Sequence, residues 1–303
     1  MKKRELPRIR HHEDVEFFRE MVRFTAAETR FSARLIEKDY FSSVLLEHIA
    51  LNLGDLLVFK GGTCLAKVHA AFYRLSEDLD FMISISFKSK RSERRRRMDP
   101  VRQMMNDLPE RLPVFKEVVP MTGANESTQY IGVLGYRSLF LKQEETIKIE
   151  IGLREPLQTP AVKQKVQTIL LDPLLNRPIV NPVTLTCISK IEAYAEKFRA
   201  ALTRREVAIR DFFDIDYAFR RLGIDSRDRP LERLIQSKIE VPGNEPIDVS
   251  EKRRSLLQQQ KETHLRPVLR EGDYQAFDLD RAFRLVRETA ERLTGKDGHR
   301  HQQ

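Results

Sequence analysis

Several features that sort proteins into classes are scarce or absent in this sequence of 303 residues. It has no Trp and only two cysteines, Cys64 and Cys187, which lie far apart. A disulfide framework and a cysteine-based metal site are therefore not indicated. No apolar run approaches the roughly 18–20 residues that a membrane-spanning helix needs. The N-terminal residues are basic but no apolar segment follows them, so a secretory signal is not expected.

The composition is typical of a folded chain. Hydrophobic residues make up 41% and charged residues 33%, which is too apolar for a disordered chain and too charged for a membrane protein. At roughly 100–200 residues per domain, two domains are expected. We expect a soluble protein of the reducing cytoplasm.

Acidic residues are outnumbered, with 45 Asp and Glu against 54 Lys and Arg, and the formal charge is +9. Residues 88–97 (KSKRSERRRR) contribute +6 of this charge. One interpretation is a solvated, mobile loop. The other is a surface that contacts the phosphate backbone of a nucleic acid, because clustered arginines are typical of such surfaces. No aromatic residue interleaves the run, so stacking of single-stranded bases is not indicated there.

Apolar spacing predicts helices and strands in alternation through the first part of the chain. Apolar residues three and four apart predict helical structure over residues 13–50. The short run at 56–59 predicts a strand, which a Gly-Gly turn separates from a helix that starts near Thr63. A helix is also expected at about residues 100–105. Further strands are predicted, with varying strength, at residues 78–83, 130–137, 145–153 and 166–171.

From residue 184 onward the pattern becomes helical to the end of the chain. Gly223 and Gly295 are expected to end helices, and the residues after Gly295 are expected to fray. We predict three parts: an N-terminal helical segment at 1–34, a core domain at 35–183 and a C-terminal helical domain at 184–303.

Three acidic side chains are candidate metal ligands. Asp78 and Asp80 are two residues apart on a predicted strand, so they project to the same face. Two neighbouring carboxylates need a counter-charge, and hard oxygen ligands suit Mg²⁺ or Mn²⁺; the alternative is a pair of ordinary acids in an exposed turn. Glu150, on the polar face of a later strand, would supply a third carboxylate; the alternative is a solvent-facing side chain beside Lys148.

A second candidate element is the turn Gly61-Gly62-Thr63 at the predicted strand-to-helix junction. Backbone N–H groups and the helix dipole favour phosphate at such a place, and glycine permits a close approach. The alternative is a simple tight turn, because the sequence fits neither the Walker A nor the dinucleotide-binding pattern.

A glycine turn, a following Asp-x-Asp strand and a later strand-borne acid resemble the arrangement in polymerase-β-type nucleotidyltransferases. More specifically, the strings LIEKDYFSSVLL and LVFKGGTCLAKVHAAFYRLSEDLDF resemble the AbiEii/AbiGii toxin family of nucleotidyltransferases. The strings EKFRAAL and IRDFFDIDYAF in the second half are similar to that family too. The likeness runs from about residue 35 to 220, with Glu150 where the family usually has Asp.

The resemblance implies an α/β fold of mixed α+β type, in which a nucleotidyltransferase core with a mixed sheet precedes a C-terminal helical domain. It places the active site in the cleft between the two. Lys38 and Asp39, in the E-K-D segment, are expected to form an ion pair at the edge of the pocket. Lys197 is the expected active-site lysine, with Lys190 as second choice. The implied catalytic residues are Asp78, Asp80, Lys197 and Asp211, with Gly61, Gly62, Thr63, Ser76, Lys190, Arg210 and Asp214 as nucleotide-binding residues and Asp78, Asp80 and Glu150 as metal ligands.

The resemblance also implies a reaction and its partners. Mg²⁺, or Mn²⁺, would align an NTP, and an acceptor hydroxyl would displace pyrophosphate. Family members are toxins with a separately encoded antitoxin, and some add nucleotides to the 3′ end of tRNA. The alternatives are an RNA- or nucleotide-binding regulator without turnover and a metal-dependent nuclease.

Overall fold

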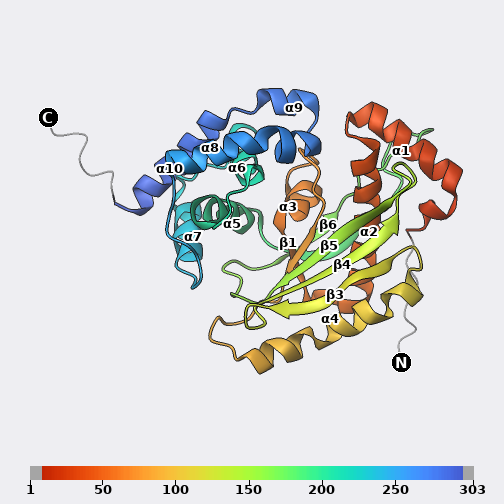
Figure 1. The fold of residues 1–303 in the computed structure, drawn as a ribbon, viewed down its shortest axis with the longest axis horizontal. Helices are drawn as coiled ribbons and strands as arrows, with labels where there is room; N and C mark the ends of the chain where they lie inside the picture. Colours follow the sequence, from red (N-terminus) through yellow and green to blue (C-terminus); the bar gives the residue numbers. More distant parts are fainter. Residues whose placement is uncertain (1–8, 296–303) are drawn as a thin grey trace. The chain divides into compact units, whose positions relative to one another are not determined.

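The computed structural model describes residues 9–295, which form two compact units, one that ends at Ile188 and one that begins at Ser189. The first unit is built on a β-sheet, and the regular elements described in the second unit are all helices (Figure 1). Among residues 9–295, no helix combines the length and apolarity that a membrane span requires.

The sheet of the first unit has seven strands in the order β3-β4-β5-β2-β1-β7-β6. β2 runs parallel to β5 and antiparallel to β1, and β1 runs parallel to β7. The sheet is therefore mixed, which confirms the predicted fold class. The strands are β1 (Val58–Lys60), β2 (Leu79–Met82), β3 (Lys116–Ala124), β4 (Gln129–Arg137), β5 (Glu144–Gly152), β6 (Val162–Val166) and β7 (Val183–Cys187).

Strand alternation separates an apolar face of the sheet from a charged face. Leu79 and Phe81 on β2 are buried and pair in register with Ile149 and Ile151 on β5. Helix α2 (Ala33–Leu53) packs on this apolar face, where the ring of Phe41 lies 4.3 Å from that of Tyr136 on β4. The residues between them in sequence, on β2 and β5, face the other way and carry the charges.

The helices that precede the sheet begin and end at identifiable caps. Asp14 accepts from the backbone N–H of Phe17 at the start of α1 (Val15–Thr29), and Arg30 ends it in the left-handed conformation. Ser32 caps α2 in the same way. The predicted helical stretch at 13–50 is thus confirmed as two helices after a short 3₁₀ turn, η1 (His11–Glu13). A second 3₁₀ turn, η2 (Gly54–Leu56), leads into β1.

Most of the basic run forms part of a helix. Helix α4 spans Arg91–Arg111, so the prediction of a helix at only 100–105 was wrong, as was the interpretation of 88–97 as a loop. Arginine is a strong helix former, and four Arg in a row extend the helix before Pro100. The helix is held by the burial of Met98, Val101 and Leu108, which follow helical spacing.

Three parts of the sheet differ from what the sequence predicted. Residues 166–171 were expected to form a strand, but β6 ends at Val166 and, apart from one bridge from Leu171, the rest is irregular. Ile169 and Leu170 are buried without strand pairing. Their apolar run therefore indicates burial but not a strand. β7 (Val183–Cys187) lies where helix was expected, because Leu185, Ile188 and Ile191 are three residues apart, as in a helix. β3 was not predicted, since only Met121 of its residues is buried.

The second unit is a set of helices around buried aromatic and charged side chains. Phe212 of α6 stacks on Phe283 of α10 at 6.0 Å between centroids. Lys238 of α7 is fully buried and pairs with Glu192 of α5 at 2.8 Å. The helices are α5 (Lys190–Thr203), α6 (Ile209–Leu222), α7 (Arg229–Ile239), α8 (Glu251–Gln260), α9 (Glu271–Ala276) and α10 (Leu279–Leu293), with short turns η4 (Lys261–Leu265) and η5 (Arg266–Val268).

Glycines end helices where predicted. Gly223 closes α6 with φ +65°, and Gly295 follows α10 with φ +69°. The predicted frayed tail beyond Gly295 lies outside the described residues, as do residues 1–8. The predicted domain boundary between residues 183 and 184 falls at the start of β7; independent folding of the three predicted parts stays a prediction.

Candidate active site

The charged face of the sheet brings the predicted strand-borne acids together. Asp80 on β2 pairs in register with Lys60 on β1 and with Glu150 on β5. Directly opposed residues of neighbouring strands share a face and lie close together. The three side chains therefore lie in one row across three neighbouring strands, in the order Lys60, Asp80 and Glu150.

Lys148 lies between the remaining acid, Asp78, and this row. Its Nζ lies 3.5 Å from Asp78 Oδ2 and 3.3 Å from Glu150 Oε2. Burial opposes the charged form, but the carboxylates of Asp78 and Glu150 raise the pKa of Lys148. Gln129, the first residue of β4, donates to Glu150 Oε1 at 2.7 Å. Glu150 thus lies beside Lys148, as its sequence suggested, and also faces Asp80.

Asp80 is an acid of this face whose ionisation is disfavoured by its surroundings. Burial, and then the negative charges of Glu150 and Asp78, raise the pKa of Asp80 to about 6. Like charges held this close disfavour each other's ionised forms. An additional cation at this point of the sheet would relieve the repulsion.

The glycine turn is packed directly against Asp80. Gly61 has φ +72°, and a Cβ placed there would overlap the carboxylate of Asp80. A Cβ on Gly62 would lie 2.6 Å from Arg74 Nη2 and 3.0 Å from Ser76 Oγ. The hydroxyl of Thr63 donates to the carbonyl oxygen of Asp78. The turn that begins α3 (Gly61–Cys64) therefore contacts Asp80 closely through Gly61 and is hydrogen-bonded to Asp78 through Thr63.

We expect Gly61→Ala to displace Asp80 and to lower activity far more than the strain of the backbone alone would. Gly223→Ala is the matched control, because Gly223 also has positive φ but nothing lies within 4 Å of its Cβ position. The control should lose only about 1 kcal/mol of unfolding free energy, the cost of a left-handed residue with a Cβ. Urea unfolding of both variants, together with an assay of the nucleotidyl transfer that the sequence resemblance implies, would check this; equal losses in the two would contradict the close approach.

The segment Glu37-Lys38-Asp39 lies in α2, on the apolar side of the sheet, and contacts residues next to the acids. Lys38 Nζ lies 3.1 Å from Glu77 Oε1, and Arg34 reaches the same carboxylate at 2.7 Å. Glu77 precedes Asp78, so α2 is tied to the segment that presents the first acid. Lys38 therefore forms an ion pair with Glu77 rather than with its neighbour Asp39.

Asp39 forms a separate, fully buried pair. Its Oδ1 lies 2.7 Å from the Nζ of Lys67 in the π-helical turn η3 (Leu65–His69). Burial lowers the pKa of Lys67, and Asp39 opposes that shift. Cys64, next to this turn, is a buried free thiol.

The donor set of the first unit suits a hard divalent cation. Asp78, Asp80 and Glu150 offer carboxylate oxygens, the ligands that Mg²⁺ prefers, and their mutual repulsion would be relieved by such an ion. In the described part of the chain, however, no three His, Cys, Asp or Glu side chains converge into an arrangement that could hold a metal. Lys148 contacts two of the three carboxylates.

In the second unit the predicted lysine and its two acids form one buried cluster. Lys197 Nζ lies 2.8 Å from Asp211 Oδ1 and 2.8 Å from Asp214 Oδ2. The side chain of Asp214 is completely buried and that of Asp211 is 6% exposed. Burial would raise the pKa of Asp211, but Lys197 and Arg204 outweigh it and hold that pKa below its usual value.

The other two predicted residues of this unit lie outside the cluster. Arg210 is half-buried at the start of α6, and Lys190 is half-buried as the first residue of α5. The structure therefore distinguishes the two candidate lysines: Lys197 lies between two buried carboxylates, and Lys190 does not.

Three residues near the acids were not named as site residues from the sequence. Lys60 reaches Asp80 through strand register, and Lys148 reaches Asp78 from the neighbouring strand, although it lies two residues from Glu150 on β5. Arg74 is 2% exposed beside Gly62, and the only signal in the sequence was its place in the R-x-S-E-D segment.

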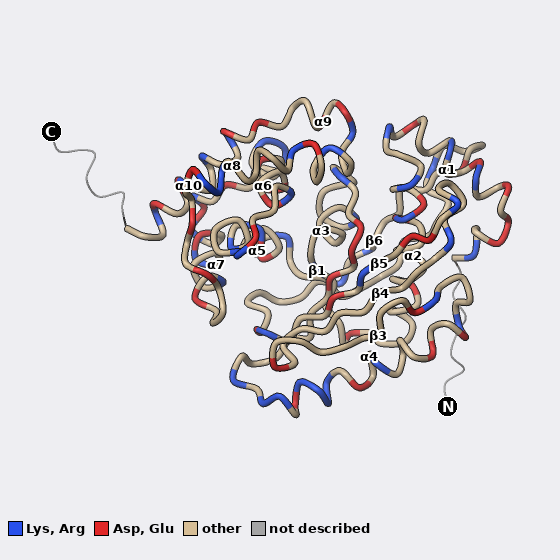
Figure 2. The backbone as a smooth tube through the Cα atoms, viewed as in Figure 1, with Lys and Arg blue, Asp and Glu red and all other residues tan. Residues whose placement is uncertain are grey.

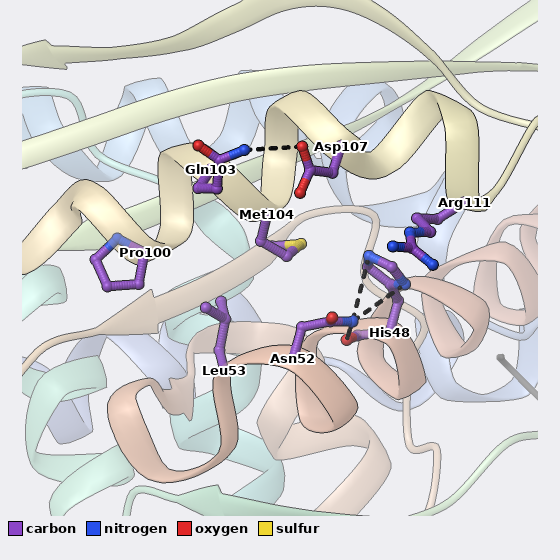
Figure 3. A pocket seen from close by; sticks show the side chains of 8 residues that line it. All are labelled: His48, Asn52, Leu53, Pro100, Gln103, Met104, Asp107 and Arg111. Atoms are coloured by element: carbon purple, nitrogen blue, oxygen red, sulfur yellow. Dashed lines mark hydrogen bonds between the residues drawn. The ribbon is translucent and has the colours of Figure 1, made fainter. Parts of the chain in front are cut away.

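A separate pocket of about 160 Å³ lies between α2 and α4 (Figure 3). Its polar lining is internally bonded: Asn52 donates to the carbonyl oxygen of His48 at 2.8 Å, and Gln103 donates to Asp107 at 2.8 Å. None of the predicted site residues lines it.

Comparisons with known proteins place the chain in a family. A family model described as the nucleotidyl transferase AbiEii toxin of type IV toxin–antitoxin systems matches residues 44–288. A candidate nucleotidyltransferase from H. pylori has a similar structure, with 15% identity over 88% of this chain and 97% of the other and a TM-score of 0.51. MenT4, a nucleotidyltransferase toxin from Mycobacterium tuberculosis, is similar with 19% identity over 86% of this chain and 94% of the other and a TM-score of 0.49. No curated protein matches the sequence.

Proposed function

Because the chain belongs to the AbiEii family of nucleotidyltransferase toxins of type IV toxin–antitoxin systems, we propose that it transfers NMP from an NTP to the 3′ end of a tRNA. The observation that carries the proposal is the packing of Gly61 against Asp80, which itself pairs in register with Glu150. A turn suited to phosphate and a set of repelling carboxylates thus lie at one point of the sheet. Both are needed by an enzyme that binds a metal-complexed triphosphate.

The chemistry is an in-line displacement. The oxygen of the acceptor hydroxyl bonds to the α-phosphorus, the bond between the α-phosphorus and the bridging oxygen breaks, and pyrophosphate leaves. Mg²⁺, or Mn²⁺, held by Asp78 and Asp80 with Glu150 would neutralise charge on the triphosphate. The hydroxyl proton must pass to a base, for which Asp211 is the candidate.

The remaining predicted residues would position the nucleotide. We assign contacts with the triphosphate to the turn Gly61–Thr63 and to Ser76, whose side chain lies beside Gly62. Lys197 and Arg210 would balance negative charge, since Lys acts as a point charge and Arg as a planar fork. Asp211 and Asp214 would hold the Lys197 ammonium in one place. Lys190 is kept as the second candidate for the lysine role.

The biological setting follows from the family. A type IV system implies a cognate antitoxin encoded separately. We propose that the acceptor is met in the cytoplasm, where tRNA is present. The net charge of +9 supports an RNA acceptor.

The test incubates purified protein with Mg²⁺, total bacterial tRNA and each of the four α-labelled NTPs in turn. Label is expected in full-length tRNA with at least one NTP, and not with an Asp78→Ala/Asp80→Ala variant. Repeating the reactions with Mn²⁺ guards against a wrong choice of metal. Shortened tRNA would favour a nuclease, label in a polypeptide would indicate a protein acceptor, and binding without label would favour a regulator.

A further inference from the structure

The start of α4 concentrates positive charge where a helix normally avoids it. The first turns of a helix favour acidic side chains, because the aligned peptide dipoles make that end positive. In α4 the only acid in the first turn is Glu93, and Lys90 at the N-cap makes no side-chain cap. Figure 2 shows the resulting basic stretch along the first half of the helix. This arrangement costs stability unless an anion binds there.

Several of these charges have no acidic partner. Arg91 pairs loosely with Glu126 at 3.6 Å, and Arg94 is used internally, because it donates to the carbonyl oxygens of Glu126 and Phe87. In the described part of the chain, no acidic side chain forms a salt bridge with Arg95, Arg96 or Arg97, and all three are exposed. At 100° per residue they spread around the helix.

The loop before α4 adds a hollow and an aromatic ring. The hollow, of about 430 Å³, is lined mainly by hydroxyl and basic side chains, with Glu93 as the one acid. The others are Ser86, Lys88, Ser89, Lys90, Ser92 and Arg96. Phe87 is 50% exposed, and Lys88 Nζ lies 5.8 Å from the centre of its ring. An exposed ring amid cations is the combination that binds an unpaired base beside its phosphate.

This surface adjoins the acids of the sheet. Arg94 ties the start of α4 to Glu126 in the β3–β4 turn. β4 begins just after that turn with Gln129, which donates to Glu150. A polynucleotide on the surface would therefore lie close to the carboxylates.

We propose that the basic surface, defined as Lys88, Lys90, Arg91 and Arg95–Arg97 together with Phe87, is where the RNA acceptor docks. The inference rests on the proposed transfer to RNA. The arginines bind successive phosphates, and Phe87 stacks on an unpaired base. An anionic membrane fits less well, because a membrane-binding helix keeps its apolar face free, whereas that of α4 is buried through Met98, Val101 and Leu108.

The charge test measures binding of a fluorescent tRNA transcript by anisotropy, without NTP and over a range of salt concentrations. Arg95→Gln/Arg96→Gln/Arg97→Gln should weaken binding roughly 10- to 100-fold near 0.1 M salt and lower the slope of log Kd against log salt by about 2. The matched control, Arg23→Gln/Arg137→Gln/Lys165→Gln, removes the same charge from exposed positions elsewhere on the first unit. Equal weakening in both variants, or none in either, would overturn the proposal.

The stacking test uses Phe87→Leu, which keeps an apolar side chain without a ring. Binding of a tRNA with an unpaired 3′ end should weaken about 5- to 100-fold, whereas Phe219→Leu, at another exposed aromatic position, should bind as before. An unchanged Phe87→Leu variant would overturn the stacking role. Loss of binding to phosphatidylglycerol vesicles in the arginine variant, with tRNA binding intact, would assign the surface to membranes instead.

Because these measurements need no turnover, they separate the docking surface from the reaction. Specific loss of tRNA binding in a protein that labels no RNA would support the surface and reject the proposed transfer. Transfer to tRNA that survives in the arginine variant at unchanged Kd would reject the surface and leave the transfer standing.

Discussion

Asp80→Asn is expected to abolish nucleotidyl transfer while the free energy of unfolding stays the same or rises. Asp80 lies between Lys60 and Glu150 in the strand register, and its carboxylate is disfavoured by burial and by the charges of Glu150 and Asp78. Removing the charge relieves that repulsion and keeps the shape of the side chain. It also removes a proposed metal ligand, which contributes several kcal/mol to the transition state, so the rate should fall on the order of 10³-fold or more. Single-turnover transfer and urea unfolding at pH 7 would check the two parts.

The matched control for this variant is Asp55→Asn in the same unit. Asp55 is an exposed acid that pairs with Lys163 at 3.0 Å, and solvent screens an exposed pair so that it contributes little to stability. Its transfer rate should match that of the unmodified protein. If Asp80→Asn retained activity, the acids of β2 would not be the reaction centre; if it lost activity only by unfolding, Asp80 would be a structural residue.

Glu150→Gln tests the third acid in the same assays. It should also lose transfer if Glu150 holds the metal, and a rate within a few-fold of the unmodified protein would remove it from the ligand set. In this variant Lys148 has only the carboxylate of Asp78 to neutralise, because Gln carries no charge. Lys148→Met is therefore a useful companion, because it removes the cation that contacts both carboxylates without touching them.

The acids could be placed on the right strands from the sequence because β2 and β5 alternate cleanly. Ile147, Ile149 and Ile151 are all buried, and their spacing alone is enough to put Glu150 on the opposite face of β5. The pairing of Asp80 with Glu150 and Lys60 could not be foreseen, since it depends on which strands are neighbours and in which register. The packing of Gly61 on Asp80 is likewise a tertiary contact that no local pattern reveals.

The elements that the sequence did not predict correctly failed for physical reasons that differ from one to the next. Exposed edge strands bury few side chains, so β3 and β6 lack the alternation by which strands are recognised. Leu185 of β7 and Ile188 directly after the strand are three residues apart and fit a helix, although Val183, Thr184 and Thr186 are β-branched and favour a strand. The density of charge in the basic run suggests a loop or a nucleic-acid surface and hides the helix propensity of arginine. The structure makes the run a helix, and it is this helix that we propose binds RNA.

Lys197→Met is expected to be the most destabilising of the site substitutions. It leaves Asp211 and Asp214 buried without the ammonium group that lies 2.8 Å from each. Breaking a buried pair by removing one partner lowers the free energy of unfolding by about 3–5 kcal/mol. Because the pKa of Asp211 is held below its usual value, the stabilisation from this pair is present above about pH 4 and is lost as the pH falls through the lowered pKa. The difference in the free energy of unfolding between the unmodified protein and Lys197→Met should therefore be large at pH 7 and small at lower pH.

A rescue experiment separates the structural effect of this cluster from a role in transfer. Lys197→Met/Asp211→Asn/Asp214→Asn removes all three charges together, so neither carboxylate is left buried without the Lys197 ammonium group, and most of the lost stability should return. If Lys197 and Asp211 act in the reaction, transfer should remain absent in this stable protein. Lys190→Met, at a half-buried position outside the cluster, should keep its stability, and its transfer rate decides which lysine serves the nucleotide. Recovery of transfer together with stability in the triple variant would make the cluster a structural feature of the second unit alone.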